Sequence, residues 1–349
     1  MKTALITGVT GQDGSFLSDF LLEKDYKVIG LYRRSSINKF DRIAHQLNNP
    51  NLELVEGDIT DPTSVSGVIS KYTPDECYNT AAMSHVHTSF EQPTYTSNVN
   101  YNGVQYILEG IRQHSPHTRL LQFSTSEMMG SNYSVRINEN GFPEKYQDEN
   151  TTFSPISPYA VSKLAAHHLV KNYRVAYNLH CSCAITYNHE SERRGENFVT
   201  RKITKWIGQF YHNINLDPKL HLGNIDSYRD WGYAKDFCPA WWSILQQEEP
   251  DDYIISTGET HSVKEFLDLA FQEIGIDDWS PYVVIDQQFF RPSDVTFLKG
   301  DSTKAREKLG WTHRTSFSEL VSLMVRNDIN EAEKTQNQTA NLYKAEATN

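Results

Sequence analysis

The sequence predicts an α/β protein, built as a Rossmann-type doubly wound parallel sheet with a smaller C-terminal α/β substrate lobe. Three observations support this fold class. A short apolar run at Thr3–Thr7 leads through a glycine loop into a segment of helical periodicity. After about residue 187, polar clusters replace the earlier pattern and indicate a second lobe. Between these points, further apolar runs alternate with helical patterns, at Lys27–Tyr32, Leu52–Val55, Asp75–Asn79, Leu120–Phe123 and Leu179–Ile185.

The first loop carries glycines at a G-x-x-G-x-x-G spacing, namely Gly8, Gly11 and Gly14. A strand, a glycine turn and a helix in succession are the context of a dinucleotide-binding loop. Glycine is needed there because a pyrophosphate approaches the backbone N–H groups at the helix N-terminus, where a Cβ would collide with it. The sequence therefore predicts a dinucleotide cofactor at this loop.

The second expected strand ends in Arg33-Arg34-Ser35-Ser36, without an acidic residue. In a Rossmann unit this position meets the adenosine ribose, where an acid favours a free 2′-hydroxyl and arginine accommodates a 2′-phosphate. The pattern therefore favours NADP over NAD, and the alternative is a solvated basic loop. Asp58, after the third strand, could accept a hydrogen bond from adenine or could only cap a helix.

Ser124–Glu127 follows the fifth expected strand, at the sheet edge where ligands bind in open α/β folds. Tyr159 opens the next helix, and Lys163 lies four residues later, so the two side chains share a helix face. The small residues of Thr80–Ser84 would let the backbone pass close to a cofactor. These segments together predict a reactive centre at the carboxyl edge of the sheet.

Arginines and lysines lie beside aromatic residues in the second half of the chain, at Asn188–Gly195, Phe198–Tyr211, Ser227–Trp231 and Phe289–Pro292. The chain has a formal net charge of −11 and therefore little basic charge to spare. These clusters predict a pocket for a phosphorylated aromatic ligand such as a nucleotide. The same net charge argues against a nucleic-acid surface.

The 349 residues suffice for two lobes. We expect an NADP-binding domain at 1–187, with part of 226–258 returning to it, a substrate lobe at 188–330 and a flexible tail at 331–349. With no membrane-length apolar run and no signal segment, we expect a cytoplasmic protein without a membrane partner. The four cysteines lack metal-ligand spacing and are expected to be reduced, mostly buried thiols.

The chain resembles the extended short-chain dehydrogenase/reductase family, and most closely the nucleotide-sugar dehydratases within it. The resemblance extends over nearly the whole chain to about residue 328 and is specific at Asn188–Ile203 and Arg229–Asp236. The other matching segments are Thr7–Ser15, Arg33–Ser36, Gly57–Asp61, Ser124–Glu127, Ser157–Lys163, Thr257–Phe266 and Arg291–Asp301.

This resemblance implies NADP as the cofactor, a GDP-sugar as the substrate, and a homodimer or homotetramer that forms through Arg33–Ser36. The implied catalytic residues are Thr125, Glu127, Tyr159 and Lys163. The implied substrate contacts are Ser84, Ser126, Asn188, Asn197, Lys202, Arg229 and Arg291. The implied cofactor contacts are Gly8, Val9, Thr10, Gly11, Gln12, Asp13, Gly14, Arg33, Arg34, Ser35, Ser36, Asp58, Ile59, Thr80, Ala81, Ala82, Met83, Ser84, Tyr95, Lys163, His189 and Arg194. No metal site is expected.

The implied reaction is a 4,6-dehydration of GDP-mannose, with Tyr159 as the base at O4 and Glu127 as the acid and base at C5 and C6. An epimerase or a reductase would share Tyr159 and Lys163 without requiring Glu127, and a non-enzymatic NADP sensor would require none of these residues. Met128-Met129 and a long polar excursion at Gly130–Thr152 depart from the family pattern. We expect both to lie beside the sugar, so another GDP-sugar such as a GDP-heptose remains an alternative.

Overall fold

A seven-stranded parallel sheet forms the centre of the protein in the computed structural model, which describes residues 1–37, 39–214 and 219–346. Its strand order is β13-β8-β5-β4-β1-β2-β3, so the chain winds outward in both directions from β1 and β4. The strands are β1 (Thr3–Thr7), β2 (Lys27–Tyr32), β3 (Leu52–Glu56), β4 (Glu76–Asn79), β5 (Arg119–Thr125), β8 (Cys181–Thr186) and β13 (Asp252–Ile255).

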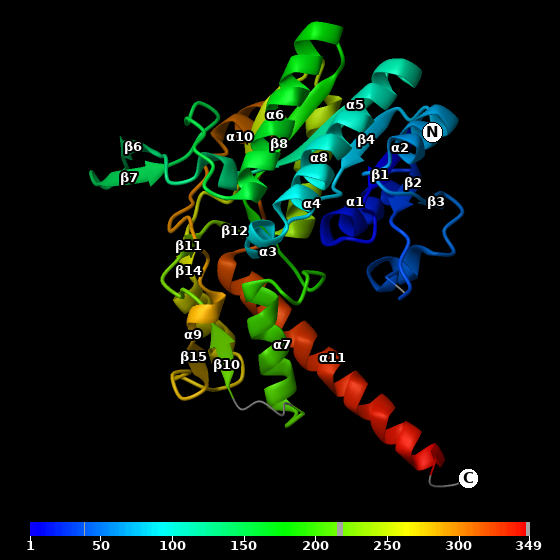
Figure 1. Cartoon of the computed structure of the whole chain (residues 1–349). Helices are drawn as coiled ribbons and strands as arrows, with labels where there is room; N and C mark the ends of the chain where they lie inside the picture. Colours follow the sequence, from blue (N-terminus) through cyan, green and yellow to red (C-terminus); the bar gives the residue numbers. More distant parts are fainter. Residues whose placement is uncertain (38, 215–218, 347–349) are drawn as a thin grey trace.

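Helices cover both faces of this sheet (Figure 1). Alternating residues of β1 supply the two cores, because Ala4 and Ile6 face one layer while Leu5 faces the other. The first layer contains α1 (Gln12–Glu23), α8 (Ala234–Gln246) and α10 (Thr303–Leu309). The second contains α2 (Pro62–Tyr72), α5 (Gly103–His114) and α6 (Pro158–Tyr177). The expected doubly wound α/β fold is confirmed.

Six strands were expected, and each is present with ends shifted by no more than two residues. The seventh strand, β13 (Asp252–Ile255), was not expected individually, although it lies within the 226–258 segment that was expected to return to this domain. All four cysteines are buried and free, and Cys181 and Cys183 face the same core as expected for alternate residues of a strand. No helix among the described residues is both long and apolar enough to cross a membrane.

A smaller lobe lies below the carboxyl edge of the sheet in Figure 1. Its core contains Trp231 and side chains from α7 (Val199–Tyr211), α9 (Val263–Gln272) and the start of α11 (Phe317–Glu346). Short strand pairs line the lobe and connect it to the sheet domain: β9 (Asn188–Glu190) with β12 (Trp231–Tyr233), β10 (Leu220–Leu222) with β15 (Val283–Ile285), and β11 (Tyr228–Arg229) with β14 (His261–Ser262). The short helical segments are α3 (Val86–Glu91), α4 (Pro93–Ser97), η1 (Asp41–Gln46), η2 (Asn98–Asn102), η3 (Ser126–Met129) and η4 (Gln287–Phe289).

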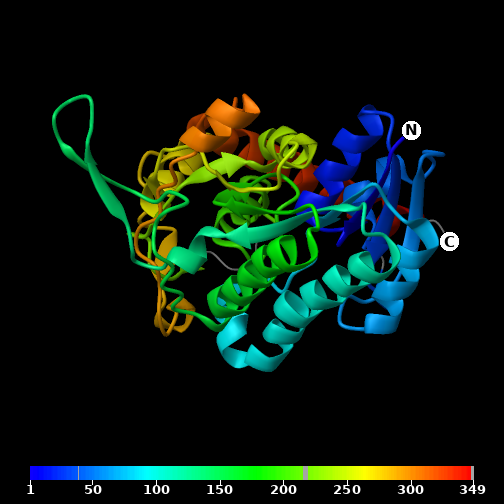
Figure 2. The same ribbon diagram turned by 90° about the horizontal axis from the view of Figure 1, so that it is seen from above.

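Met128-Met129 and the Gly130–Thr152 excursion were both expected to lie beside the sugar, and this expectation is wrong, because no residue of either segment lines the cleft at the carboxyl edge of the sheet. Met128 and Met129 are fully buried in an apolar cluster with Tyr187 and Leu298. The polar excursion forms a hairpin of β6 (Ser134–Ile137) and β7 (Pro143–Tyr146) that projects from the body (Figure 2).

In the described part of the segment from residue 331, α11 continues as a helix to Glu346. The flexible tail at 331–349 stays a prediction.

Gly14 carries the close approach between α1 and the turn before it. A Cβ at Gly14 would lie 2.5 Å from the carbonyl oxygen of Gly8 and 2.8 Å from Cα of Val9, and both are backbone atoms that cannot rotate away. Gly14→Ala should therefore lower the free energy of unfolding by about 1–3 kcal/mol, measured by chemical denaturation. Gly67→Ala is the matched control, because this exposed position in α2 has no heavy atom within 4 Å of the new Cβ. Gly67→Ala should raise the free energy of unfolding by about 0.5–1 kcal/mol. An equal loss of unfolding free energy in both variants would contradict the close approach at Gly14.

Candidate active site

A cleft of about 1260 Å³ lies at the carboxyl ends of the sheet strands and extends to the smaller lobe. It is positioned where β1 and β4 lie side by side and the connections leave in opposite directions, the usual ligand site of a doubly wound sheet. Residues from the glycine loop, the ends of β4, β5 and β8, and the lobe segments around Arg229 and Arg291 all line it.

The glycine loop forms one wall of the cleft. Gly8 has a positive φ of 70°, and a Cβ there would lie 3.0 Å from the backbone of Ala81. Thr80 donates a hydrogen bond of 2.6 Å to the carbonyl oxygen of Thr7, and the Ala81 N–H donates to the Thr7 hydroxyl at 3.2 Å. These contacts hold the β4 loop against the glycine loop, leaving a narrow cradle beside the N-terminus of α1 that suits a pyrophosphate.

Most of the expected cofactor contacts meet at this wall, but not all. Val9 is completely buried behind the loop, and Gly14 packs against the Gly8 carbonyl. Arg34, Ser35 and Ser36 are exposed and are not part of the cleft lining. The expected cofactor contacts that do line the cleft are Gly8, Thr10, Gly11, Gln12, Asp13, Arg33, Asp58, Ile59, Thr80, Ala81, Ala82, Met83, Ser84, Tyr95, Lys163, His189 and Arg194.

Asp13 and His189 form a partly buried ion pair in the wall of the cleft, with 3.1 Å between Oδ1 and Nε2. Burial alone would raise the pKa of Asp13, but attraction and hydrogen bonding to His189 lower it to about 2. Burial alone would lower the pKa of His189, but Asp13 raises it above its ordinary value. The second ring nitrogen of His189 lies 2.7 Å from the carbonyl oxygen of Tyr187, which fixes the ring orientation.

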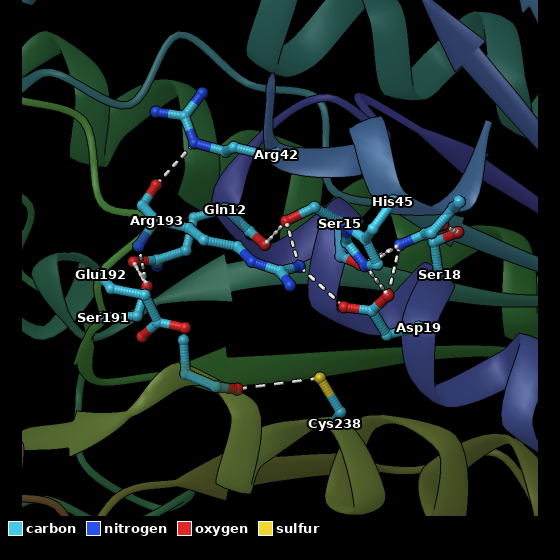
Figure 3. A network of polar contacts seen from close by, with 12 residues as sticks. Gln12, Ser15, Ser18, Asp19, Arg42, His45, Ser191, Glu192, Arg193 and Cys238 are labelled. Carbon is cyan, nitrogen blue, oxygen red and sulfur yellow. Dashed lines mark hydrogen bonds and ion pairs between the residues drawn. The ribbon is translucent and has the colours of Figure 1, made fainter. Parts of the chain in front are cut away.

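A second group of polar contacts anchors the loop after β9 onto α1 (Figure 3). Arg193 Nη1 donates to Asp19 at 2.8 Å and to Ser15 at 3.1 Å, and its guanidinium lies 4.1 Å from the Phe16 ring centroid. Arg42 Nε donates to the Arg193 carbonyl at 2.6 Å. Arg193 therefore anchors this loop to α1 and so positions the neighbouring residues of the loop that line the cleft.

Thr125, Glu127, Tyr159 and Lys163 all line the cleft. Thr125 ends β5, and its hydroxyl accepts from the Glu127 N–H at 3.3 Å, which begins η3. Tyr159 lies in the first turn of α6, whose N-terminus is capped by Ser157. The structure thus brings the four expected catalytic residues to one region, where β5, η3 and α6 supply them.

Burial raises the pKa of Tyr159 to about 12, although a hydrogen bond with Thr125 opposes this shift. Burial lowers the pKa of Lys163 to about 8, so its amine is mostly protonated at neutral pH. The Lys163 ammonium donates to the carbonyl oxygen of Phe123 at 2.8 Å. At neutral pH the phenol of Tyr159 is therefore neutral, and the Lys163 ammonium is held beside the end of β5.

The expected substrate contacts occupy the lobe side of the cleft. Arg229 and Arg291 both contact Asp294, and Arg291 Nη1 lies 4.0 Å from Glu127 Oε1. Lys202 Nζ lies 3.6 Å from the ring centroid of Phe289. The remaining expected contacts that line the cleft are Ser84, Ser126, Asn188 and Asn197. This end of the cleft combines several cations with aromatic rings, as expected for a nucleotide.

Several residues at or behind the cleft were not anticipated from the sequence. Asn100 is buried behind the cleft lining in a π-helical turn, where it accepts from the Met83 N–H at 2.9 Å and donates to Ser162 at 3.1 Å, so it connects the β4 loop to α6. A π-turn inside an expected helix gives no periodicity signal. Lys39, Arg42, His85 and Asp294 also line the cleft.

The matching family model is described as GDP-mannose 4,6 dehydratase and covers residues 5–324. GDP-mannose 4,6 dehydratase 1 of Arabidopsis thaliana is 46% identical over 343 residues, covering 95% of this chain and 91% of the relative. Such identity over nearly the full length of both proteins is evidence of common family membership.

Two solved structures show the same fold. The dTDP-glucose 4,6-dehydratase of Bacillus anthracis, in complex with NAD, has a TM-score of 0.79 and 21% identity, covering 95% of this chain and 98% of the other. RMD from Pseudomonas aeruginosa, complexed with NADPH, has a TM-score of 0.73 and 19% identity, covering 95% and 100%. Because one holds NAD and the other NADPH, fold similarity does not decide between these cofactors.

The Asp13–His189 pair should give stability a defined pH window. The lowered pKa of Asp13 contributes stability above its ordinary value of 3.8, which is lost as the pH falls through about 2. The raised pKa of His189 contributes stability below its ordinary value of 6.5, which is lost as the pH rises through the folded value. The difference in unfolding free energy between the unsubstituted protein and His189→Gln should therefore be largest between about pH 4 and 6.5.

Chemical denaturation across a pH series measures this difference. His117→Gln, at an exposed position, is the control and should show no such window. A His189→Gln difference that stays constant from pH 4 to pH 9 would contradict the ion pair.

Proposed function

The chain belongs to the GDP-mannose 4,6-dehydratase family, and we propose that it removes water from GDP-D-mannose to give GDP-4-dehydro-6-deoxy-D-mannose, with NADP as its cofactor. The observation that carries the proposal is the convergence of Thr125, Glu127, Tyr159 and Lys163 in one cleft, with the arginines of the lobe side next to Glu127. The glycine cradle and the partly buried Asp13–His189 pair fit a dinucleotide beside these residues.

NADP, when bound, supplies a hydride acceptor that takes hydrogen from C4 of the sugar and returns it at C6. Tyr159 takes the proton of the 4-hydroxyl, and Thr125 holds the same region by its hydrogen bond to the phenol. Because burial keeps the phenol neutral, a nearby positive charge must favour its ionised form. We assign this role to Lys163, which lines the same cleft, together with Arg194, whose charge lowers the pKa of the phenol. A carbonyl at C4 makes the C5 proton acidic.

Glu127 is the carboxylate available for that proton, because it lines the cleft two residues beyond Thr125. It removes the C5 proton and then donates that proton to the departing 6-hydroxyl, so that one water leaves. When hydride returns at C6, the phenol of Tyr159 gives back its proton to C5, and both side chains end in their starting protonation states. This assignment favours a dehydratase over an epimerase or reductase, neither of which requires Glu127. The case for a GDP-heptose weakens, since Met128 and Met129 are buried in the core and cannot select the sugar.

The division into an NADP domain at 1–187 and a substrate lobe at 188–330 remains part of this proposal, as does assembly into a dimer or tetramer through the exposed Arg33–Ser36 segment. The return of the chain to the first domain agrees with α8 packing beside α1 and β13 pairing with β8. A cytoplasmic location stays a prediction.

The choice of NADP rests on the basic side chains after β2. Arg33, Lys39 and Arg42 line the cleft, and Arg33 donates to the Tyr95 hydroxyl at 2.6 Å. Arg33→Ala should reduce the ratio of NADP to NAD affinity roughly tenfold, the effect of one charge-assisted hydrogen bond. Arg34→Ala is the matched neighbour outside the cleft and should change the ratio much less. Calorimetric binding of both cofactors measures this, and NAD binding more tightly than NADP would refute the proposal.

The dehydration itself is tested by incubating the protein with GDP-mannose and looking by mass spectrometry for the loss of one water. Glu127→Gln keeps the shape but removes the base, so the product rate should fall by roughly a hundredfold or more while GDP-sugar binding persists. Tyr159→Phe should fail earlier, before C4 is oxidised. Glu91→Gln, at an exposed helix position, is the control.

Two outcomes would contradict this mechanism. Dehydration by Glu127→Gln at close to the unsubstituted rate would show that the carboxylate is only structural. Deuterium placed at C4 of the substrate should appear at C6 of the product, and its loss to solvent would exclude an internal hydride return.

A further inference from the structure

One carboxylate oxygen connects the two arginines of the lobe side. Asp294 Oδ1 accepts from Arg229 Nη2 at 3.1 Å and from Arg291 Nη1 at 3.0 Å. The other oxygen, Oδ2, accepts from the Ser227 hydroxyl at 3.2 Å. All four side chains line the cleft. Asp294 is thus an acidic residue at the place where a negatively charged ligand is expected.

A carboxylate partner favours the charged forms of Arg229 and Arg291 in the cleft. The Arg229 side chain is only 8% exposed, and burial lowers its pKa, while Glu127 and Asp294 favour its charged form. The two guanidinium groups also repel each other, and the charge of Arg291 contributes to the lowered pKa of Arg229. A carboxylate oxygen shared by both relieves this repulsion and fixes the distance between them.

We propose that Asp294 is a positioning residue, which spaces Arg229 and Arg291 so that together they hold the two phosphates of a nucleoside diphosphate. The inference rests on the proposed function for the nucleotide-sugar class of the substrate. Asp294 does not itself contact the phosphates favourably. It acts through the two guanidinium groups, each of which has further N–H donors available beyond the one directed to Asp294.

Through Arg291, Asp294 also affects the surroundings of the Glu127 carboxylate. Arg291 Nη1 lies 3.0 Å from Asp294 but 4.0 Å from Glu127. The closer contact therefore keeps the Arg291 guanidinium on the phosphate side of the cleft. This leaves Glu127 free to act on the sugar when a diphosphate is bound.

Asp294 could repel the phosphates or position the arginines, and removing its charge would change the GDP affinity in opposite directions in the two cases. If Asp294 only repels phosphate, then Asp294→Asn removes a negative charge and should bind GDP more tightly. If it positions the arginines, the same variant should bind GDP more weakly, by roughly tenfold, while GMP, with one phosphate, loses much less. Calorimetry with GDP and GMP, at one pH and with NADP present, measures both ligands.

Asp301→Asn is the matched control. Asp301 contacts two arginines, Arg136 and Arg306, but lies outside the cleft lining. Its variant should bind GDP and GMP as the unsubstituted protein does. Asp294→Glu retains the charge and should recover part of the GDP affinity. Asp294→Ser, which also removes the charge, replaces Asp294→Asn as the test variant if the latter does not fold.

A double-mutant cycle tests whether Asp294 acts through Arg291. In an Arg291→Ala background, Asp294→Asn should weaken GDP binding further by less than about twofold, because the partner is already absent. Unchanged or tighter GDP binding by Asp294→Asn, equal losses for GDP and GMP, or full additivity in the cycle would each overturn the inference. Binding of UDP and dTDP is measured alongside. If one of these binds in place of GDP, the proposed substrate fails, while the effect of Asp294 on that diphosphate still tests its positioning role.

Discussion

The buried carboxylate of Asp230 is the interaction on which the lobe side of the cleft depends. It accepts four hydrogen bonds, from the N–H groups of Thr257, Gly258 and Gly300 and from the Thr257 hydroxyl, at 2.7–3.1 Å. Three segments distant in sequence therefore meet at one fully buried side chain. Burial raises the pKa of Asp230, and these donors oppose the shift by favouring the ionised form. Because Arg229 is the preceding residue, its backbone is fixed by the same cluster.

The opposite side of the cleft is held by α1. Its first turn faces the cradle, while Ser15 and Asp19, later in the same helix, hold Arg193. The adjacent Arg194 turns the other way: it lines the cleft, contacts Glu190 at 3.1 Å and lies 3.7 Å from the Phe198 ring centroid. Two consecutive arginines thus have different roles, one in anchoring a loop and one at the ligand site. Their shared charge could not distinguish these roles in the sequence.

The sheet and its ligand edge could be predicted because they depend on local patterns. Apolar runs with a glycine turn indicate strands, and the end of each strand is automatically at the edge of the sheet, so Ser124–Glu127 was correctly placed. Long-range packing was not predictable in this way. Met128 and Met129 follow Glu127 directly, yet the tight η3 turn directs them into the core beside Tyr187. Asp294 was missed because the sequence does not show that it contacts both Arg229 and Arg291, and without those contacts an acidic residue near phosphate-binding arginines indicates no role.

The electrostatics of the cleft bear on how the proposed base is activated. Burial is the largest influence on both groups, raising the pKa of Tyr159 to about 12 and lowering that of Lys163 to about 8, so a neutral phenol and a mostly protonated amine coexist at neutral pH. A buried phenolate needs a cation beside it, at a large cost in desolvation. The charge of Arg194 lowers the pKa of the phenol, whereas the acidic Glu127 opposes its ionisation. In the proposed mechanism the phenol therefore becomes a stronger base as further positive charge comes near it, which couples proton removal to assembly of the complex.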